Sequence, residues 1–191
     1  MTKAISGLPF FLLAGILLNS EFTLQHTSKE SERKSKEEDS VVFVLEYNLP
    51  NFSGGYLTVL RDITGTKYLP LYIGAAEGEA ISRALSRQRP PRPLTHDLIT
   101  EIVSQLGGEI QSLIINDLRD NVFYGTLTIK QGKKIHKIDC RPSDGLALAL
   151  RSSSEIRVNR EVINRAGLSS EEMLKKGYPL NKSNKFLEQG I

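Results

Sequence analysis

The chain has 191 residues, a formal net charge of +3 and a sequence pI near 8.9. That length is enough for one globular domain with a proper core. The mild basicity permits contact with nucleic acid, but no dense Lys/Arg tract requires it. A single cysteine, Cys140, excludes an intrachain disulfide framework and a zinc cluster built on thiolates. We interpret Cys140 as a small core residue.

An apolar segment at residues 8–18 follows Lys3. Its length suits the hydrophobic region of a signal peptide and falls short of the about 20 residues that span a bilayer. We therefore predict that residues 1–20 are a hydrophobic targeting or tethering segment, which favours an exported or membrane-tethered protein over a cytoplasmic one. Residues 21–40 are rich in Lys, Glu and Ser and predict a charged, solvated linker.

Runs of β-branched and aromatic residues predict strands at 41–45, 56–60 and 68–73. Because Pro70 cannot donate a ladder hydrogen bond, the third strand is expected at a sheet edge or at a bulge. Apolar residues at helical spacing predict a helix at 75–85. They predict a second helix that Thr95 caps and that the pair Gly107-Gly108 ends.

The second half of the domain alternates strands and helices. Strands are expected at 110–115, 122–129, 134–138 and 156–158, with tight turns at Asp120-Asn121 and Gln131-Gly132. A dense apolar run after Pro142 predicts a buried helix. A small helix is expected at 160–166, and the spacing from Ser169 to Glu172 predicts another, followed by a loosely ordered tail. Adjacent strands broken by helices indicate an α+β fold: a mixed, mostly antiparallel sheet with helices packed on it.

Four segments carry a family resemblance: residues 69–74 with Glu77, residues 92–97, residues 116–120 with Phe123 and Tyr124, and residues 139–150. In this order they resemble the bifunctional nuclease family, whose members have been described as degrading both DNA and RNA. The resemblance implies a nuclease domain at 41–167, followed by a C-terminal helix and tail at 168–191. It also implies DNA and RNA as partners, and a homo-oligomer is compatible with it. Gly78, Cys140 and Gly145 depart from the family pattern, which has alanine or another small residue there.

Charged residues stand where these predicted elements begin or end. Carboxylates can hold Mg²⁺ or Mn²⁺, which stabilises charge on phosphorus and activates water. The candidate metal ligands are Glu77, Asp117, Asp139 and Asp144. Arginine can bind phosphate bidentately, so Arg92 and Arg141 are the candidate phosphate ligands. The candidate catalytic residues are His96, as general base, with Asp97, Asp139 and Asp144.

A purely structural interpretation explains the same residues. Acids in first helical turns, such as Asp97 and Asp144, are favoured by the helix dipole without any chemistry. Arg141 could pair with Asp139 or Asp117 and hold the sheet to the buried helix. The alternative function is therefore a non-catalytic binding or regulatory domain with structural carboxylate–arginine pairs.

Overall fold

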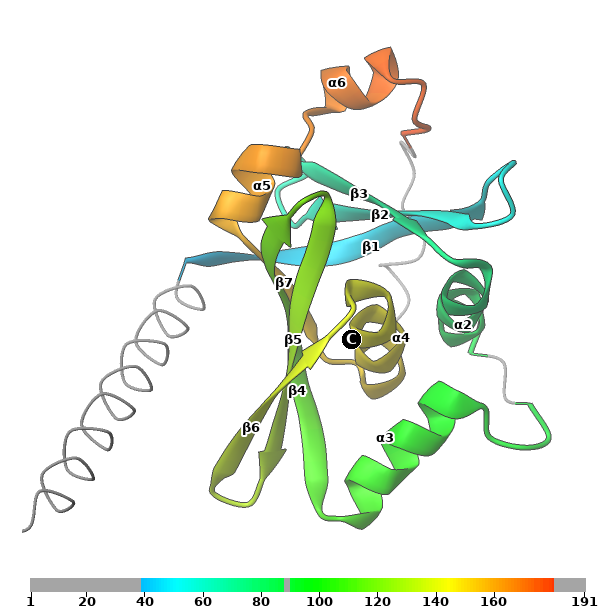
Figure 1. Cartoon of the computed structure of the whole chain (residues 1–191), viewed down its shortest axis with the longest axis vertical. Coiled ribbons are helices and arrows are strands. Elements are labelled where there is room, and N and C mark those ends of the chain that lie inside the picture. The colour runs from blue at the N-terminus through cyan, green and yellow to red at the C-terminus, as the bar shows by residue number, and fades with distance from the viewer. Residues whose placement is uncertain (1–38, 88–89, 181–191) are drawn as a thin grey trace, which may run out of the picture. The chain divides into compact units, whose positions relative to one another are not determined.

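The computed structural model describes residues 39–87 and 90–180 (Figure 1). Within these residues the strands form one sheet of seven, in the order β3-β2-β1-β7-β4-β5-β6. Neighbouring strands are antiparallel, except that β4 and β7 are parallel. The predicted α+β fold with a mixed, mostly antiparallel sheet is confirmed.

The sheet has two edge strands with different characters. The strands are β1 Ser40–Pro50, β2 Tyr56–Asp62, β3 Tyr68–Ile73, β4 Gly108–Arg119, β5 Val122–Gln131, β6 Lys134–Cys140 and β7 Glu155–Asn159. One edge is β3, where Pro70 lies opposite Val59, so the predicted edge position of this strand is confirmed. The other edge is β6, whose residues from Lys134 to Asp139 are all exposed.

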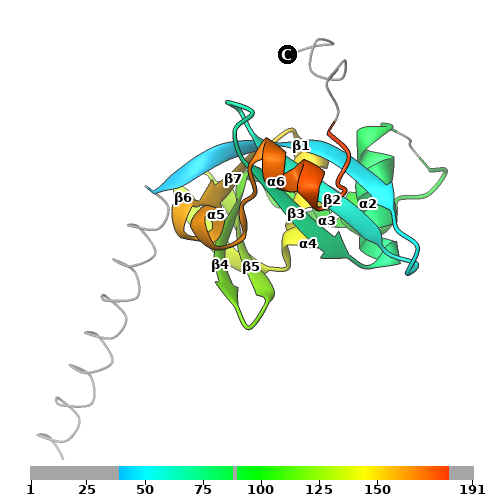
Figure 2. The same cartoon turned by 90° about the horizontal axis from the view of Figure 1, so that it is seen from above.

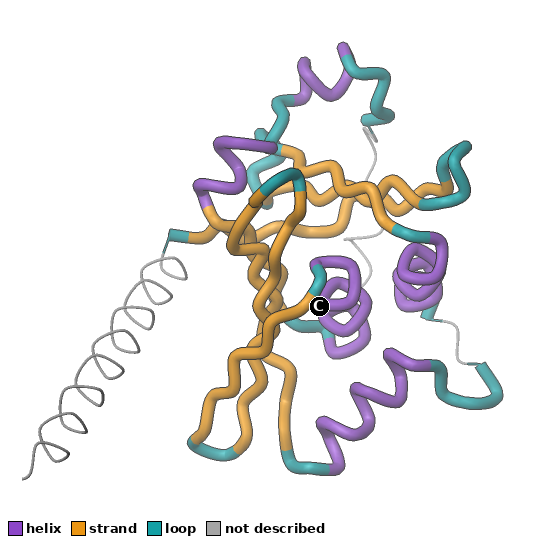
Figure 3. Tube along the Cα trace, viewed as in Figure 1, coloured by secondary structure: helices purple, strands orange, loops and turns teal. Residues whose placement is uncertain are grey.

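Three helices gather on one side of the β4–β6 strands. The helices of the domain are α2 Ala75–Leu85, α3 Thr95–Gln105, α4 Pro142–Ser152, α5 Arg160–Ala166 and α6 Ser170–Lys175. Figures 1 and 3 show α4 beside the sheet, with α2 and α3 next to it. Seen from above in Figure 2, α5 and α6 lie close to β3 and β7. The arrangement gathers the beginnings of α2, α3 and α4, which carry the charged residues considered below.

Helix α4 is the centre of the core, as its apolar run predicts. Leu146, Ala147 and Ala149 are fully buried and join a cluster that includes Leu113 of β4 and Ile81 of α2. Pro142 occupies the first turn, where a missing N–H is harmless. The helix ends at Ser153, whose φ of 54° is left-handed. Because α4 is buried on most sides, packing fixes the position of its first turn. That turn carries Asp144, one of the candidate site residues.

The packing explains two glycines of the chain, Gly78 and Gly145. A Cβ atom at Gly78 of α2 would collide with the ring base of Tyr56, and one at Gly145 of α4 would collide with the buried side chain of Leu113. Collisions of this kind force shifts in a packed core. At these two positions the neighbouring side chains therefore leave no room for a Cβ atom.

Two predictions about local structure need correction. The N-cap of α3 is Leu94 rather than Thr95, and Asp97 accepts a hydrogen bond from the Leu94 N–H at 2.9 Å. The tail after α6 is packed as far as Leu180, because Tyr178 and Leu180 contact the cluster around Met173. Residues 181–191 lie outside the described residues.

The predicted targeting segment and most of the predicted linker fall at residues 1–38, outside the described residues. Within the described part of the chain, no helix is long and apolar enough to cross a membrane. Export or tethering by the N-terminal segment therefore stays a prediction.

Candidate active site

Arg141 lies between two carboxylates at the beginnings of two helices. Its Nε is 2.7 Å from Asp144 Oδ2, and its Nη2 is 2.8 Å from Glu77 Oε1 and 3.2 Å from Asp144 Oδ1. Asp144 is in the first turn of α4 and Glu77 in the first turn of α2. The Arg141 side chain is still 67% exposed, so its guanidinium is held in place while remaining open to solvent.

His96 brings the first turn of a third helix to the same point. Its Nε2 is 3.3 Å from Asp144 Oδ1, and its side chain is only 13% exposed. The first turns of α2, α3 and α4 therefore meet around Glu77, His96 and Asp144. The positive ends of helix dipoles favour negative charge, both from carboxylates and from bound anions. Glu77, His96, Arg141 and Asp144 form what we call the Arg141 cluster.

Asp97 has a structural role that the sequence did not reveal. Its Oδ1 is 2.6 Å from Nε of Arg151, in the last turn of α4. Arg151 Nη1 also donates to the carbonyls of Ala80 in α2, at 3.0 Å, and Ala147, at 2.9 Å. Only 10% of the Arg151 side chain is exposed. Arg151 therefore joins all three helices. One feature of the sequence could have pointed to this role: Arg151 is the first charged residue after the apolar run of α4.

The Asp97 carboxyl makes stability depend on pH. Burial raises its pKa, but the hydrogen bonds from Arg151 and from the Leu94 N–H outweigh this, so the pKa of Asp97 lies below its ordinary value. A carboxyl with a lower pKa in the folded state stabilises the fold above the unfolded value of about 3.9, and this contribution is lost as the pH falls through the folded pKa.

We therefore expect Asp97→Asn to cost the most stability at neutral pH and progressively less below about pH 4. Urea unfolding of both proteins at neutral pH and in acid measures this difference. A difference in unfolding free energy that stays constant with pH would contradict the role of the Asp97 charge.

The remaining predicted site residues lie elsewhere. Asp117 is 3.1 Å from Nε of Arg119, and the guanidinium of Arg119 lies 3.9 Å from the ring centroid of Tyr124. Asp139 is exposed on β6, opposite Thr126. Arg92 is exposed in the loop before α3. The expected pairing of Arg141 with Asp139 or Asp117 is wrong, because Arg141 pairs with Asp144 and Glu77.

Strand alternation explains why Asp117 and Asp139 are not in the Arg141 cluster. The open side of Gly125 faces Leu113 and Cys140, toward α4, so the next residues on β5, Tyr124 and Thr126, face the other side of the sheet. Asp117 pairs with Tyr124 and Asp139 with Thr126. Residues directly opposite each other share a face. Both carboxylates therefore point away from the helices.

The four predicted metal ligands are consequently split between two faces of the sheet. In the described ranges, no group of three or more His, Cys, Asp or Glu side chains is arranged to hold a metal ion. Glu77 and Asp144 are the two that converge, and the guanidinium of Arg141 pairs with both. In this arrangement the carboxylates of Glu77 and Asp144 bind a guanidinium and not a divalent cation.

These contacts define an α+β domain in which an exposed arginine, paired with two carboxylates, lies where three helices begin, beside a histidine–carboxylate pair. The model of the bifunctional nuclease domain matches residues 58–171. The chain therefore belongs to the bifunctional nuclease domain family.

The relatives differ in identity to this chain and in how much of it they cover. An uncharacterized protein of Mycobacterium tuberculosis is 40% identical over 110 residues, covering 58% of this chain and 65% of that protein. Bifunctional nuclease 1 of Oryza sativa subsp. japonica is 25% identical over 103 residues, covering 52% of this chain and 31% of the rice protein. Bifunctional nuclease 2 of Arabidopsis thaliana is 26% identical over 117 residues, with 59% and 36% covered. The chain thus matches less than two thirds of the mycobacterial protein and about one third of each plant protein.

Proposed function

We propose that this chain is a nuclease that hydrolyses phosphodiester bonds of DNA and RNA with low sequence specificity, and that the Arg141 cluster is its active site. Family membership and the names of the plant relatives support the reaction class. The exposed guanidinium held at three helix starts supports the location. A site that contacts phosphate carries no direct sequence information, which agrees with low specificity.

Arg141 is the residue that binds the scissile phosphate in this proposal. Its Nε and Nη2 hold Asp144 and Glu77, and its Nη1, which takes part in neither pair, can donate a charge-assisted hydrogen bond to a phosphate oxygen. Asp144 and Glu77 hold it in one orientation, so little side-chain entropy is lost on binding. Negative charge develops on the phosphate oxygens during hydrolysis, and a preorganised donor at that position stabilises it.

His96 is the general base. With its Nε2–H donated to Asp144, the lone pair on Nδ1 is available to accept a proton from an attacking water. Asp144 fixes this tautomer and stabilises the imidazolium that forms, as a carboxylate partner of histidine does in other hydrolases. Asp144 is thus a positioning residue for both Arg141 and His96.

In this proposal a divalent cation would bind together with the substrate. Mg²⁺ is usually held by one or two carboxylates together with substrate phosphates, and Mn²⁺ accepts the same oxygen ligands. Glu77 and Asp144 are the carboxylates that would hold it, and a bound ion would supply further charge stabilisation. Both are paired to Arg141, so no step above depends on the ion.

We expect the highly purified protein to cleave both single-stranded DNA and RNA of mixed sequence. Gel analysis of end-labelled substrates, with and without EDTA, measures this. Cleavage that survives EDTA agrees with charge stabilisation by Arg141 without an ion, and cleavage that EDTA abolishes shows that a divalent cation is also required. No cleavage of either polymer under either condition would contradict the proposal and favour a non-catalytic binding domain.

A further inference from the structure

Helix α3 carries an apolar face that the rest of the described domain does not cover. None of its residues is buried, although its sequence is amphipathic. Leu98 is 49% exposed, Ile102 48% and Leu106 67%. On the neighbouring edge strand, Ile138 is 46% exposed and lies opposite Leu127, whose side chain faces the helices. We call these four residues the α3–β6 face. An exposed apolar surface of this extent marks an interaction site.

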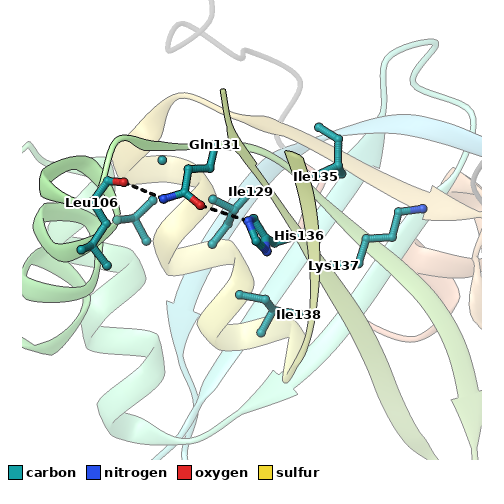
Figure 4. Close-up of a pocket in the computed structure, with 9 residues that line it drawn as sticks. Leu106, Ile129, Gln131, Ile135, His136, Lys137 and Ile138 are labelled. Carbon is teal, nitrogen blue, oxygen red and sulfur yellow. Dashed lines mark hydrogen bonds between the residues drawn. The ribbon is translucent and has the colours of Figure 1, made fainter. Parts of the chain in front are cut away.

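A groove of about 540 Å³ runs through this face, between the C-terminal half of α3 and β6. Val103, Leu106, Ile129 and Ile138 line it with aliphatic surface. Figure 4 shows Gln131 bonded on both sides: its amide nitrogen donates to the Leu106 carbonyl at 2.8 Å, and its Oε1 is 3.2 Å from Nε2 of His136. The amide of Gln131 is therefore occupied, and the aliphatic lining offers apolar contact to other aliphatic side chains.

We propose that the α3–β6 face binds a second copy of this chain and forms a symmetric dimer. The charges flanking the face favour a copy of itself. On a helical wheel Glu101, which is exposed, lies on the flank of α3 away from β6, whereas exposed Lys134 lies on the β6 side. A two-fold axis running roughly along α3 places the acidic flank of one protomer on the basic flank of its partner. An interface of this isologous kind needs both complementary halves on one surface.

The position of β6 adds to this proposal. It is the terminal strand of the sheet, so one side of its backbone has no neighbouring strand within the described residues. Exposed sheet edges pair readily with other chains. The open strand edge borders the apolar face, so a partner bound to the face also shields part of this edge. Anionic occupants such as a nucleic acid or a lipid surface fit less well, because the exposed acid Glu101 and the exposed base Lys134 flank the face on opposite sides.

Light scattering on the full-length chain tests the dimer. We expect the mass to approach twice 21.3 kDa with rising concentration. Leu98→Gln/Ile102→Gln should remain at the monomer mass with an unchanged circular dichroism spectrum. The matched control is Ile63→Gln/Leu174→Gln, since both residues are 62% exposed outside the face, and it should dimerise like the wild type. A monomeric wild type, or a double variant that still dimerises, overturns the proposal.

A charge exchange tests the two-fold arrangement without removing apolar surface. Glu101→Lys should weaken dimerisation several-fold, because it places like charges opposite Lys134 of the partner subunit. Adding Lys134→Glu in the same chain should restore it. If the double exchange dimerises no better than Glu101→Lys alone, the proposed contact between the flanks is overturned. Binding of an oligonucleotide or of anionic vesicles that Leu98→Gln/Ile102→Gln abolishes would assign the face to that occupant and overturn the dimer.

Discussion

Arg141→Ala is expected to reduce cleavage of DNA and RNA by about 10²–10³-fold while leaving the fold almost unchanged. Removing one preorganised donor to a developing oxyanion costs that much in other hydrolases. The stability effect is small because the Arg141 side chain is 67% exposed, and exposed ion pairs contribute about 0.2–1 kcal/mol. If Arg141 belonged to a buried ion pair instead, removing it would cost about 3–5 kcal/mol of unfolding free energy.

Initial cleavage rates and thermal melts of the same preparations measure both effects. Arg92→Ala is the matched control, because Arg92 is exposed in the loop before α3 and outside the Arg141 cluster. Arg141→Lys separates charge from geometry, since lysine keeps the charge but loses the bidentate fork. Wild-type rates in Arg141→Ala would remove Arg141 from the active site.

Arg151→Met is expected to have the largest effect on stability, about 3 kcal/mol. The substitution keeps much of the side-chain volume but leaves the Asp97 carboxylate and the Ala80 carbonyl without their arginine donor. Removing one partner of a buried pair costs about 3–5 kcal/mol, and we expect the lower end because Asp97 is partly exposed. Cleavage should also fall, because Arg151 fixes α3 and therefore His96.

Urea unfolding measures this loss. Arg83→Ala is a suitable control, since Arg83 makes an exposed pair with Glu79 within α2 and should cost less than about 0.5 kcal/mol. Combining Arg151→Met with Asp97→Asn should recover part of the loss, because the uncompensated charge is then removed. A loss no larger than that of Arg83→Ala would show that the pair does not hold the helices together.

The sequence predicted most of the fold because local patterns and tertiary packing agree in this chain. Helices α2 and α5 have the predicted bounds, and Asp120 and Asn121 both adopt the positive φ expected of a tight hairpin turn. The strand order was not predictable, because the parallel pairing of β4 with β7 depends on contacts distant in sequence. The N-cap of α3 was misplaced by one residue, because the side chain that bonds the Leu94 N–H is Asp97 from inside the helix.

The site was predicted only in part, for a specific physical reason. Glu77, His96, Arg141 and Asp144 stand at helix starts, and helix starts converge when the helices pack side by side. Asp117 and Asp139 stand on strands, where the face depends on register. The register of β4 shifts between Ile115 and Asp117, which turns Asp117 to the face opposite to that of Ile115. A bulge of this kind leaves no clear mark in the sequence.

The most direct test of the central claim is to compare cleavage by Asp144→Asn and Asp139→Asn. Each substitution neutralises one aspartate: Asp144 belongs to the Arg141 cluster, and Asp139 is exposed on β6. We predict that Asp144→Asn loses at least about 10²-fold in rate, because both Arg141 and His96 lose their common partner. Asp139→Asn should cleave at nearly the wild-type rate. Equal rates in the two variants, or a larger loss in Asp139→Asn, would contradict the placement of the active site at the three helix starts.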